Sequence, residues 1–206
     1  MARSLVAFSF GFGAALFITC SAIWWYSSSG EKGFGKKKKK SQINRENFQE
    51  YPQDLVREQL SRNYSFIGEE GMQKIRSSFV VVVGAGGVGS HAVHLHARSG
   101  IGRIRVIDFD QVSLSSLNRH ALATIEDVGK GKTEVLASHL SQIAPFCQVE
   151  AVQEKFDASV AERLLMMKPV ALEGEKKPDF VVDCIDNIDT KVELLAWCYN
   201  RQIPIV

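Results

Sequence analysis

The residues with the clearest chemical potential lie in a glycine-rich run, "VVVVGAGGVGSHA", at positions 80–92. Its glycines, which include the pattern GxGxxG, are Gly84, Gly86, Gly87 and Gly89. Such a loop directly after a strand brings backbone amides to a phosphate, and a helix expected to begin at Ser90 would add the positive end of its dipole. Asp108 follows about 20 residues later, the position from which a carboxylate binds a ribose hydroxyl. Both features suit NAD as well as ATP, so the loop alone leaves the nucleotide open.

Charged residues after Asp108 indicate which of the two nucleotides the site would bind. Arg119 lies in "DFDQVSLSSLNRH", and Lys132, in "VGKGKTEV", is expected to start a helix. A dinucleotide needs few cations because backbone amides largely satisfy its pyrophosphate, whereas a triphosphate that releases pyrophosphate gains from fixed cations. Asp186, in "DCIDN", follows an expected strand and could hold Mg²⁺. Each residue alone would be an ordinary surface charge or a helix cap, but together they favour ATP with Mg²⁺ over NAD.

Short apolar runs that alternate with helical patterns must position these residues. Buried strands are expected at 79–83, 104–108, 149–153 and 180–185. An apolar face recurs over 135–143 before Pro145 ends the helix. The apolar positions of a later helix repeat at Val192, Leu195, Ala196 and Tyr199. This alternation predicts an α/β fold with a doubly wound, mostly parallel, Rossmann-like sheet, whose ligand binds at the carboxyl ends of the strands. The run "IPIV", at 203–206, is expected to be a fifth strand, in a domain that is incomplete at its C-terminus.

Composition narrows the class of protein. A length of 206 residues and a formal net charge of +2 fit one α/β domain plus a tail, and do not indicate a protein that coats nucleic acid. The four cysteines form no CxxC pair, so neither a zinc ribbon nor a disulfide framework is indicated and a reducing compartment is expected. Cys184 and Cys198 lie in apolar elements and are expected in the core. His91, His94 and His96 spread too far around one helix to bind a single metal ion.

The N-terminus differs from the rest of the chain. The segment 5–26, "LVAFSFGFGAALFITCSAIWWY", carries no charge and is long enough to span a bilayer, with aromatic residues at its end. A lysine block at 36–40 favours an uncleaved anchor whose following residues stay on the cytosolic side. The expected organisation is a transmembrane anchor at 1–28, a flexible basic tether at 29–55 and an ATP-binding domain at 56–206. A cleaved signal peptide is the alternative for the first segment.

The motifs together carry a family resemblance. In order and spacing, "GAGGVGS", "DFDQVSLSSLNRH", "GKGKTEV" and "DCIDN" resemble the adenylating domain shared by ubiquitin-activating enzymes and the molybdopterin- and thiamine-biosynthesis adenylyltransferases. Within that superfamily, "SRNYSFIGEEGMQKI", "RSGIGRIRVIDFD", "LNRH" and "YNRQIPIV" are most similar to the tRNA threonylcarbamoyladenosine dehydratases. The resemblance implies ATP-dependent cyclisation of threonylcarbamoyladenosine, beside the tRNA anticodon, through an acyl-adenylate.

The resemblance also implies roles for single residues. Nucleotide binding falls to the loop glycines Gly84, Gly86, Gly87 and Gly89, and to Asp108, Asp110, Arg119 and Lys132. Arg119 and Lys132 would contact the phosphates, and Asp186 would hold Mg²⁺. Arg62, in "LSRN", would reach the ATP of a partner subunit, so a homodimer is implied. At Ser116 the sequence departs from related adenylyltransferases, which often have an asparagine near the phosphates.

The family resemblance also implies a location in the cell, and other functions remain as alternatives. Fungal members of the resembled family are similar in carrying an N-terminal anchor, which implies the mitochondrial outer membrane with the globular domain in the cytosol. The first alternative is an enzyme that adenylates the C-terminus of a ubiquitin-like or sulfur-carrier protein. An NAD-dependent oxidoreductase, which Arg119 and Lys132 disfavour, and a membrane-anchored scaffold that has lost catalysis are the others. For the scaffold, the intact cationic and acidic positions argue against loss of nucleotide binding but not against loss of turnover.

Overall fold

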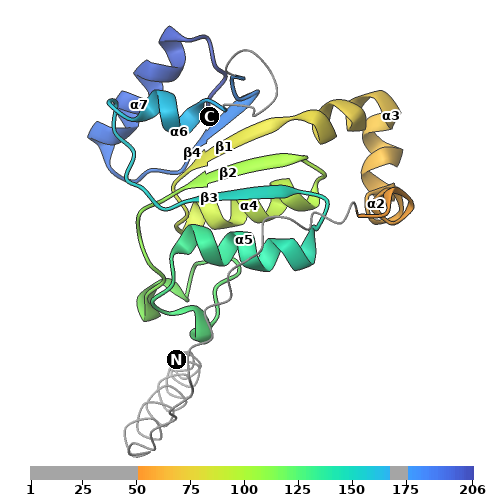
Figure 1. The fold of residues 1–206 in the computed structure, drawn as a ribbon, viewed down its shortest axis with the longest axis horizontal. Coiled ribbons are helices and arrows are strands. Elements are labelled where there is room, and N and C mark those ends of the chain that lie inside the picture. Colours follow the sequence, from red (N-terminus) through yellow and green to blue (C-terminus); the bar gives the residue numbers. More distant parts are fainter. Residues whose placement is uncertain (1–50, 168–175) are drawn as a thin grey trace, which may run out of the picture. The chain divides into compact units, whose positions relative to one another are not determined.

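A computed structural model describes residues 51–167 and 176–206. A four-stranded parallel sheet forms the centre of this part of the chain. Its strands, in the spatial order β3-β2-β1-β4, are β1 (Phe79–Val83), β2 (Arg103–Ile107), β3 (Gln148–Val152) and β4 (Phe180–Asp183). Every pairing between them is parallel (Figure 1). The valine run of β1 is buried along its whole length because this strand lies between β2 and β4. The predicted parallel α/β sheet is confirmed.

Helices cover both faces of the sheet. On one face lie α4 (Gly87–Arg98) and α5 (Lys132–Ile143), and on the other lie α6 (Ala161–Leu165) and α7 (Ile188–Asn200) (Figure 1). Alternate residues of β1 supply the two cores: Val80 and Val82 pack with α4 and α5, whereas Val81 and Val83 pack with α6 and α7. The sheet is therefore doubly wound, as predicted.

The structure corrects the start of one helix. Helix α4 begins at Gly87, three positions before the expected Ser90, with Gly86 as its extended N-cap residue. The early start brings the first turn of the helix into the glycine loop itself, so that its free amides belong to the loop glycines. The end predicted for α5 is confirmed, because Ile143 is its last residue and Ala144 its C-cap, directly before Pro145.

The structure also corrects the face on which α7 packs. The expected apolar positions Val192, Leu195 and Tyr199 are exposed, by 57%, 42% and 83%. Leu194 and Cys198 are fully buried against the sheet instead. Both sides of this helix carry apolar residues, so spacing alone could not distinguish the buried face from the exposed one.

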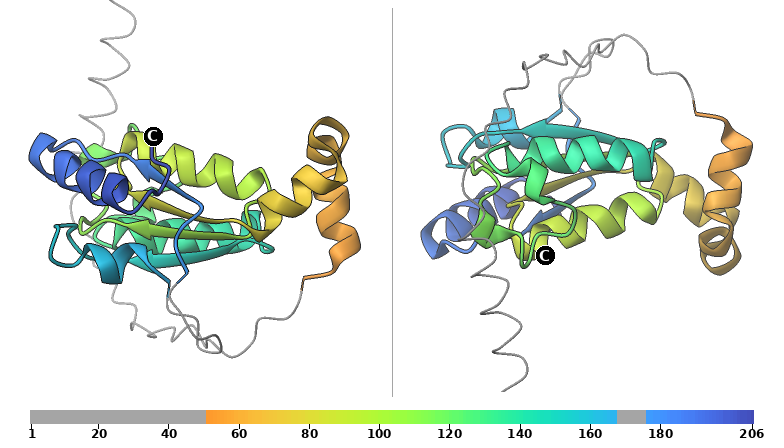
Figure 2. Two further views of the ribbon diagram at one scale, coloured as in Figure 1. Left: turned by 90° about the horizontal axis from the view of Figure 1, so that it is seen from above. Right: turned by 90° about the horizontal axis from the view of Figure 1, so that it is seen from below.

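Helices α2 (Gln53–Gln59) and α3 (Ser61–Ser77) precede β1 and project beyond the end of the sheet (Figure 2). They pack on each other through a small core of Val56, Leu60 and Met72. Helix α3 is interrupted at Gly68, whose φ of 82° is left-handed. The side-chain amide of Asn63 donates to the carbonyl of Ser99, in the turn that leads into β2. The two helices therefore lie at the amino ends of the strands.

The last residues begin the expected fifth strand beside β4. Val181 and Ile205 form a parallel bridge, and the amide of Asp183 donates to the carbonyl of Val206 at 2.8 Å. At the other end of the chain, the predicted anchor and most of the predicted tether lie outside the described residues, and α2 begins within the last positions expected of the tether. None of the helices within 51–167 and 176–206 has the length and hydropathy of a membrane-spanning segment.

Candidate nucleotide site

The glycine loop lies at the carboxyl end of β1, where a parallel sheet binds its ligands. Gly84 has a φ of 101°, and a Cβ there would lie 2.5 Å from the carbonyl oxygen of Cys184. A Cβ on Gly89 would overlap the carbonyl oxygen of Gly84. By contrast, a Cβ on Gly86 would meet nothing within 4 Å. Gly84 and Gly89 thus hold the loop in shape, and Gly86 faces the open space that a nucleotide phosphate would need.

Asp108 fixes this loop to the end of β2. Its Oδ2 accepts a hydrogen bond from the amide of Ala85 at 2.6 Å, and its Oδ1 accepts one from the amide of Asp110 at 2.7 Å. Each carboxylate oxygen has a second lone pair, so the group could still accept from a ribose hydroxyl. The expected carboxylate is therefore next to the glycine loop.

Arg119 reaches the same loop from the segment that follows β2. A Cβ on Gly87 would lie 3.4 Å from Cδ of Arg119, so the arginine stem packs against the first residue of α4. The guanidinium is exposed, and its Nη1 donates to the carbonyl of Ser115 at 2.9 Å. This arrangement places an exposed cationic end beside amides that attract an anion.

At Ser116, where the family resemblance leads us to expect an asparagine, the structure gives the side chain a local role. This residue ends the short 3-10 helix η1 (Leu114–Ser116) and is 5% exposed. Its hydroxyl donates to the carbonyl of Ser113 and accepts from the amide of Ser113, at 2.7 and 2.9 Å. The side chain is thus used to close the turn that precedes Arg119.

Lys132 begins α5, as predicted, and its ammonium lies in the site. Its Nζ is 2.8 Å from Oδ2 of Asp110, and its side chain is only 11% exposed. The backbone amide of Lys132 also donates to the carbonyl of Asp110. Two sequence-predicted residues are therefore joined directly, and through the amide of Asp110 they are linked to Asp108.

Asp186 follows β4 in the segment that leads into α7. This segment borders the glycine loop, because the carbonyl of Cys184 is the group that a side chain on Gly84 would meet. The carboxylate of Asp186 is exposed and has no ion pair within the described part of the chain. No group of three or more metal-ligating side chains occurs among residues 51–167 and 176–206. Mg²⁺ is commonly bound by one or two carboxylates together with nucleotide phosphates, so a single carboxylate fits that ion.

Arg62 is the one predicted site residue that the fold keeps away from the others. It is exposed near the start of α3, and Asn63 beside it bonds to the turn before β2. That turn lies at the amino ends of the strands, whereas the glycine loop lies at the carboxyl ends. Arg62 therefore does not meet the glycine loop of its own chain.

Two polar atoms beside the cations were not identified from the sequence. The buried side-chain atoms without a hydrogen-bond partner in the described residues are Nε2 of His120 and Oγ1 of Thr133. His120 directly follows Arg119 and Thr133 directly follows Lys132. The sequence showed only that each residue is next to a predicted cation. Their burial depends on tertiary packing and could not be predicted from that position.

The thiols and the helical histidines have structural roles. Cys198 is fully buried, and burial raises the pKa of its thiol to about 11. Burial also raises the pKa of Cys184. Both thiols are therefore poor nucleophiles, and Cys198 lies in the core as expected, whereas Cys184 is half-buried beside it. His94 accepts a hydrogen bond from Arg98, and His96 bonds to the carbonyl of Ala92, so these histidines are used within α4.

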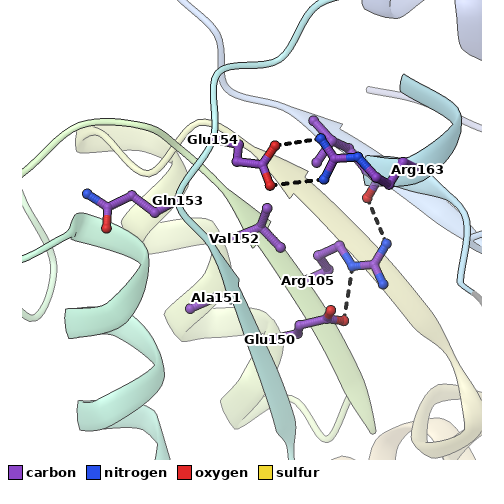
Figure 3. Close-up of a pocket in the computed structure, with 8 residues that line it drawn as sticks. Arg105, Glu150, Ala151, Val152, Gln153, Glu154 and Arg163 are labelled. Carbon is purple, nitrogen blue, oxygen red and sulfur yellow. Dashed lines mark hydrogen bonds and ion pairs between the residues drawn. The ribbon is translucent and has the colours of Figure 1, made fainter. Parts of the chain in front are cut away.

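A separate hollow of about 380 Å³ lies along β3 and α6 (Figure 3). Its two arginines already have carboxylate partners. Arg105 pairs with Glu150 at 3.0 Å, and Arg163 forms a bidentate pair with Glu154 at 2.9 and 2.6 Å. Because these charges are neutralised within the hollow, it offers less to a triphosphate than the glycine loop does.

The fold and this site define an α/β nucleotide-binding domain in which a carboxylate and two cations lie beside a glycine loop. Residues 60–206 match the ThiF family, and the chain belongs to this family. It is 47% identical over 159 residues to tRNA threonylcarbamoyladenosine dehydratase 2 of Saccharomyces cerevisiae, covering 77% of this chain and 34% of that protein. It is 34% identical to the Bacillus subtilis tRNA threonylcarbamoyladenosine dehydratase, covering 72% of this chain and 55% of that protein.

A solved structure agrees with these relatives. The Escherichia coli tRNA N6-threonylcarbamoyladenosine dehydratase, in complex with ATP, matches with a TM-score of 0.65 and 33% identity. The match covers 74% of this chain and 59% of that one. The chain thus spans between about a third and three fifths of the length of these relatives.

Proposed function

We propose that the protein is an ATP-dependent tRNA threonylcarbamoyladenosine dehydratase that works through an acyl-adenylate. The observation that carries the proposal is the packing of Arg119 on Gly87, which sets a cation at the first turn of α4 in the glycine loop. Lys132, Asp108 and Asp110 complete the set at the same end of the sheet. The named activities of the yeast and bacterial relatives supply the substrate.

The proposed reaction has two steps. A carboxylate oxygen of the threonylcarbamoyl group attacks the α-phosphorus of ATP, the bond to the bridging oxygen breaks, and pyrophosphate leaves. The carbamoyl group of the same nucleoside then attacks the activated carbonyl, closes a ring and releases AMP. The second step needs no catalytic nucleophile from the protein, because an intramolecular group already has a high effective molarity.

The residues of the site have separate tasks in this proposal. Amides of the glycine loop hold the phosphates, and Asp108 orients the ribose. Arg119 and Lys132 stabilise the charge that develops on the departing pyrophosphate. Asp186 holds Mg²⁺, which neutralises phosphate charge when it is bound.

We further propose a homodimer in which Arg62 serves the site of the partner subunit. Support comes from the exposure of Arg62 and from its place at the amino ends of the strands, away from its own glycine loop. Mixing Arg62→Ala with Arg119→Ala subunits should then restore part of the lost activity, since one of the two mixed sites has both arginines. No restoration would contradict the shared site.

The proposed location is the mitochondrial outer membrane, with the globular domain on the cytosolic side. Support comes from the uncharged segment 5–26 and the lysines at 36–40. The full-length protein should stay in the membrane pellet after alkaline carbonate extraction, with its domain open to added protease. Recovery in the soluble fraction with a shortened N-terminus would show a cleaved targeting segment instead.

Nucleoside mass spectrometry tests the activity. The full-length protein, ATP and tRNA bearing threonylcarbamoyladenosine should give a nucleoside lighter by one water, with AMP and pyrophosphate in equal amounts. Arg119→Ala should reduce the rate by about 10²-fold, as is typical for a lost preorganised charge contact. Arg163→Ala is the matched control, because this exposed arginine lies in the hollow along β3.

Two outcomes would contradict the proposal. If the nucleoside stayed unchanged while a ubiquitin-like or sulfur-carrier protein became adenylated, the substrate would be a protein C-terminus and not tRNA. Tighter binding of NAD than of ATP would end the adenylation proposal.

A further inference from the structure

The side chain of His120 is buried, although it directly follows the exposed Arg119. Its neighbours Asn118 and Arg119 are exposed, whereas His120 is 6% exposed. Its Nδ1 accepts hydrogen bonds from the amides of Leu122 and Ala123, at 3.3 and 3.0 Å. The imidazole therefore closes the turn of the chain that directly follows the arginine.

This turn is attached to the helix on which Arg119 packs. The amide of Ala121 donates to Oγ of Ser90 in α4 at 2.9 Å, and Gly87, in the same helix, contacts the arginine stem. On the other side, the amides of Arg119 and His120 donate to the carbonyl of Ser116, at 3.1 and 3.0 Å. Arg119 is thus held between η1 and the turn that His120 closes.

The hydrogen bonds determine the protonation state of His120. Because Nδ1 accepts from amides, it carries no proton, and the ring is neutral with its hydrogen on Nε2. Protonation would put an N–H at Nδ1 against two amide N–H groups, so donors would face donors. The turn is therefore compatible only with the neutral ring.

The surroundings favour the neutral ring as well. Burial lowers the pKa of His120, and the positive charge of Lys132 on α5 and the neighbouring His91 on α4 act in the same direction. Asp108 and Asp127 act in the opposite direction, but they do not outweigh burial. Acid conditions are then needed to charge the ring.

We propose that His120 is the positioning residue for Arg119, and that its neutral imidazole keeps the arginine at the nucleotide. Protonation opens the turn, releases Arg119 from its place on α4 and weakens ATP binding. This inference rests on the proposed function, because it takes ATP as the ligand of the site. His120 itself does not need to contact the nucleotide.

Two substitutions at His120 separate its nitrogen atoms. His120→Asn retains an acceptor near the position of Nδ1 that does not titrate, whereas His120→Gln places its polar group near Nε2. In the full-length protein, ATP affinity should be near wild type for the asparagine variant and about tenfold weaker for the glutamine variant at neutral pH. Equal affinities for the two variants would overturn the role of Nδ1.

The pH dependence gives a readout that a purely structural role would not change. ATP itself takes up a proton in mildly acidic solution, so the quantity to compare is the ratio of wild-type to His120→Asn affinity. This ratio should fall as the pH drops through the pKa of His120, because only the wild-type turn can be opened by protonation. His94→Asn removes another histidine whose pKa is lowered by burial, and it should keep the wild-type profile. A constant ratio would overturn the proposal.

Two further measurements test whether Arg119 carries the effect. In an Arg119→Ala background, His120→Gln should cause no further loss of ATP affinity, whereas an additive loss would contradict positioning. Nitrogen NMR of the imidazole should show the proton on Nε2 at neutral pH, and a proton on Nδ1 would exclude the turn described here. If the wild-type protein bound no ATP, the proposed function would fail, while the NMR result would still decide the state of the turn.

Discussion

The Nζ of Lys132 lies 2.8 Å from Oδ2 of Asp110, so the cation at the start of α5 has a carboxylate partner within the candidate nucleotide site. The pair is asymmetric, because the lysine side chain is 11% exposed and the aspartate side chain is 49% exposed. A phosphate that approaches Lys132 therefore also approaches a negative charge. The two residues should act on nucleotide binding as a coupled unit.

Removing only the lysine should cost more than removing both residues. Lys132→Ala is expected to weaken ATP binding by about 1.5 to 3 kcal/mol, because it removes a charge-assisted contact and leaves Asp110 facing the phosphates. The double variant Lys132→Ala/Asp110→Ala should recover part of that loss. Calorimetric titration with ATP measures all the variants, and an additive double variant would show that the ion pair has no bearing on the nucleotide.

Asp186→Asn should affect the metal-dependent step specifically. The amide keeps the size of the side chain but removes the charge that would hold Mg²⁺ against the phosphates. We expect pyrophosphate exchange to fall by about 10²-fold at saturating Mg²⁺, with little change in metal-free ATP affinity. Asp189→Asn, at an exposed position in the first turn of α7, is the control. If the two substitutions had equal effects on pyrophosphate exchange, Asp186 would not be a ligand of Mg²⁺.

Alanine substitutions at two glycines of the loop should affect different properties, namely folding at Gly89 and ATP binding at Gly86. Gly89→Ala would overlap the carbonyl of Gly84, so it should lower the thermal unfolding midpoint strongly or prevent folding. A side chain on Gly86 meets no atom within 4 Å, and the φ there is −77°, so Gly86→Ala should fold normally. It should still weaken ATP binding, because the added methyl group occupies the space that a phosphate would enter. Thermal unfolding and ATP titration together distinguish these outcomes, and an unfolded Gly86→Ala protein would contradict the open geometry.

A buried carboxylate should make stability depend on pH in acid. Burial raises the pKa of Asp127, but hydrogen bonds from Lys130, His139 and Thr124 outweigh burial and hold that pKa well below its usual range. A carboxyl group with a depressed folded-state pKa stabilises the fold above its unfolded-state pKa, near 4, and loses that contribution as the pH falls towards the folded-state value.

Asp127→Ala should therefore lower the free energy of unfolding by about 3 kcal/mol at neutral pH, since it removes a buried carboxylate that accepts charge-assisted hydrogen bonds from half-exposed partners. The difference from wild type should shrink below about pH 4. Denaturant unfolding over a range of pH measures it, with the exposed neighbour Glu126→Ala as the control. A difference that stayed constant into strong acid would show that the carboxylate charge is not the cause.

The sequence by itself determined the parallel α/β sheet and predicted most of the candidate nucleotide site. Apolar runs predicted the largely buried strands β1, β2 and β4, because a sheet covered on both faces needs strands that are apolar on both sides. The burial predicted for the strand at 149–153 is wrong, because β3 lies at the edge of the described sheet and its residues are exposed or half-buried. Glycine spacing predicted that the loop, Asp108, Arg119 and Lys132 would share one end of the sheet, since a loop after a parallel strand must lie at the edge where the other strands also end. These features depend on order along the chain and were therefore readable from it.

Tertiary structure decided what depends on contacts between distant segments. Only packing showed that Leu194 and Cys198 form the buried face of α7, because that helix is apolar on both sides. Only the fold placed Arg62 at the amino ends of the strands and His120 in the interior, with its nitrogen on two backbone amides. Burial and hydrogen-bond partners come from residues that meet in space, so a linear pattern could suggest the chemistry of these side chains but not their surroundings.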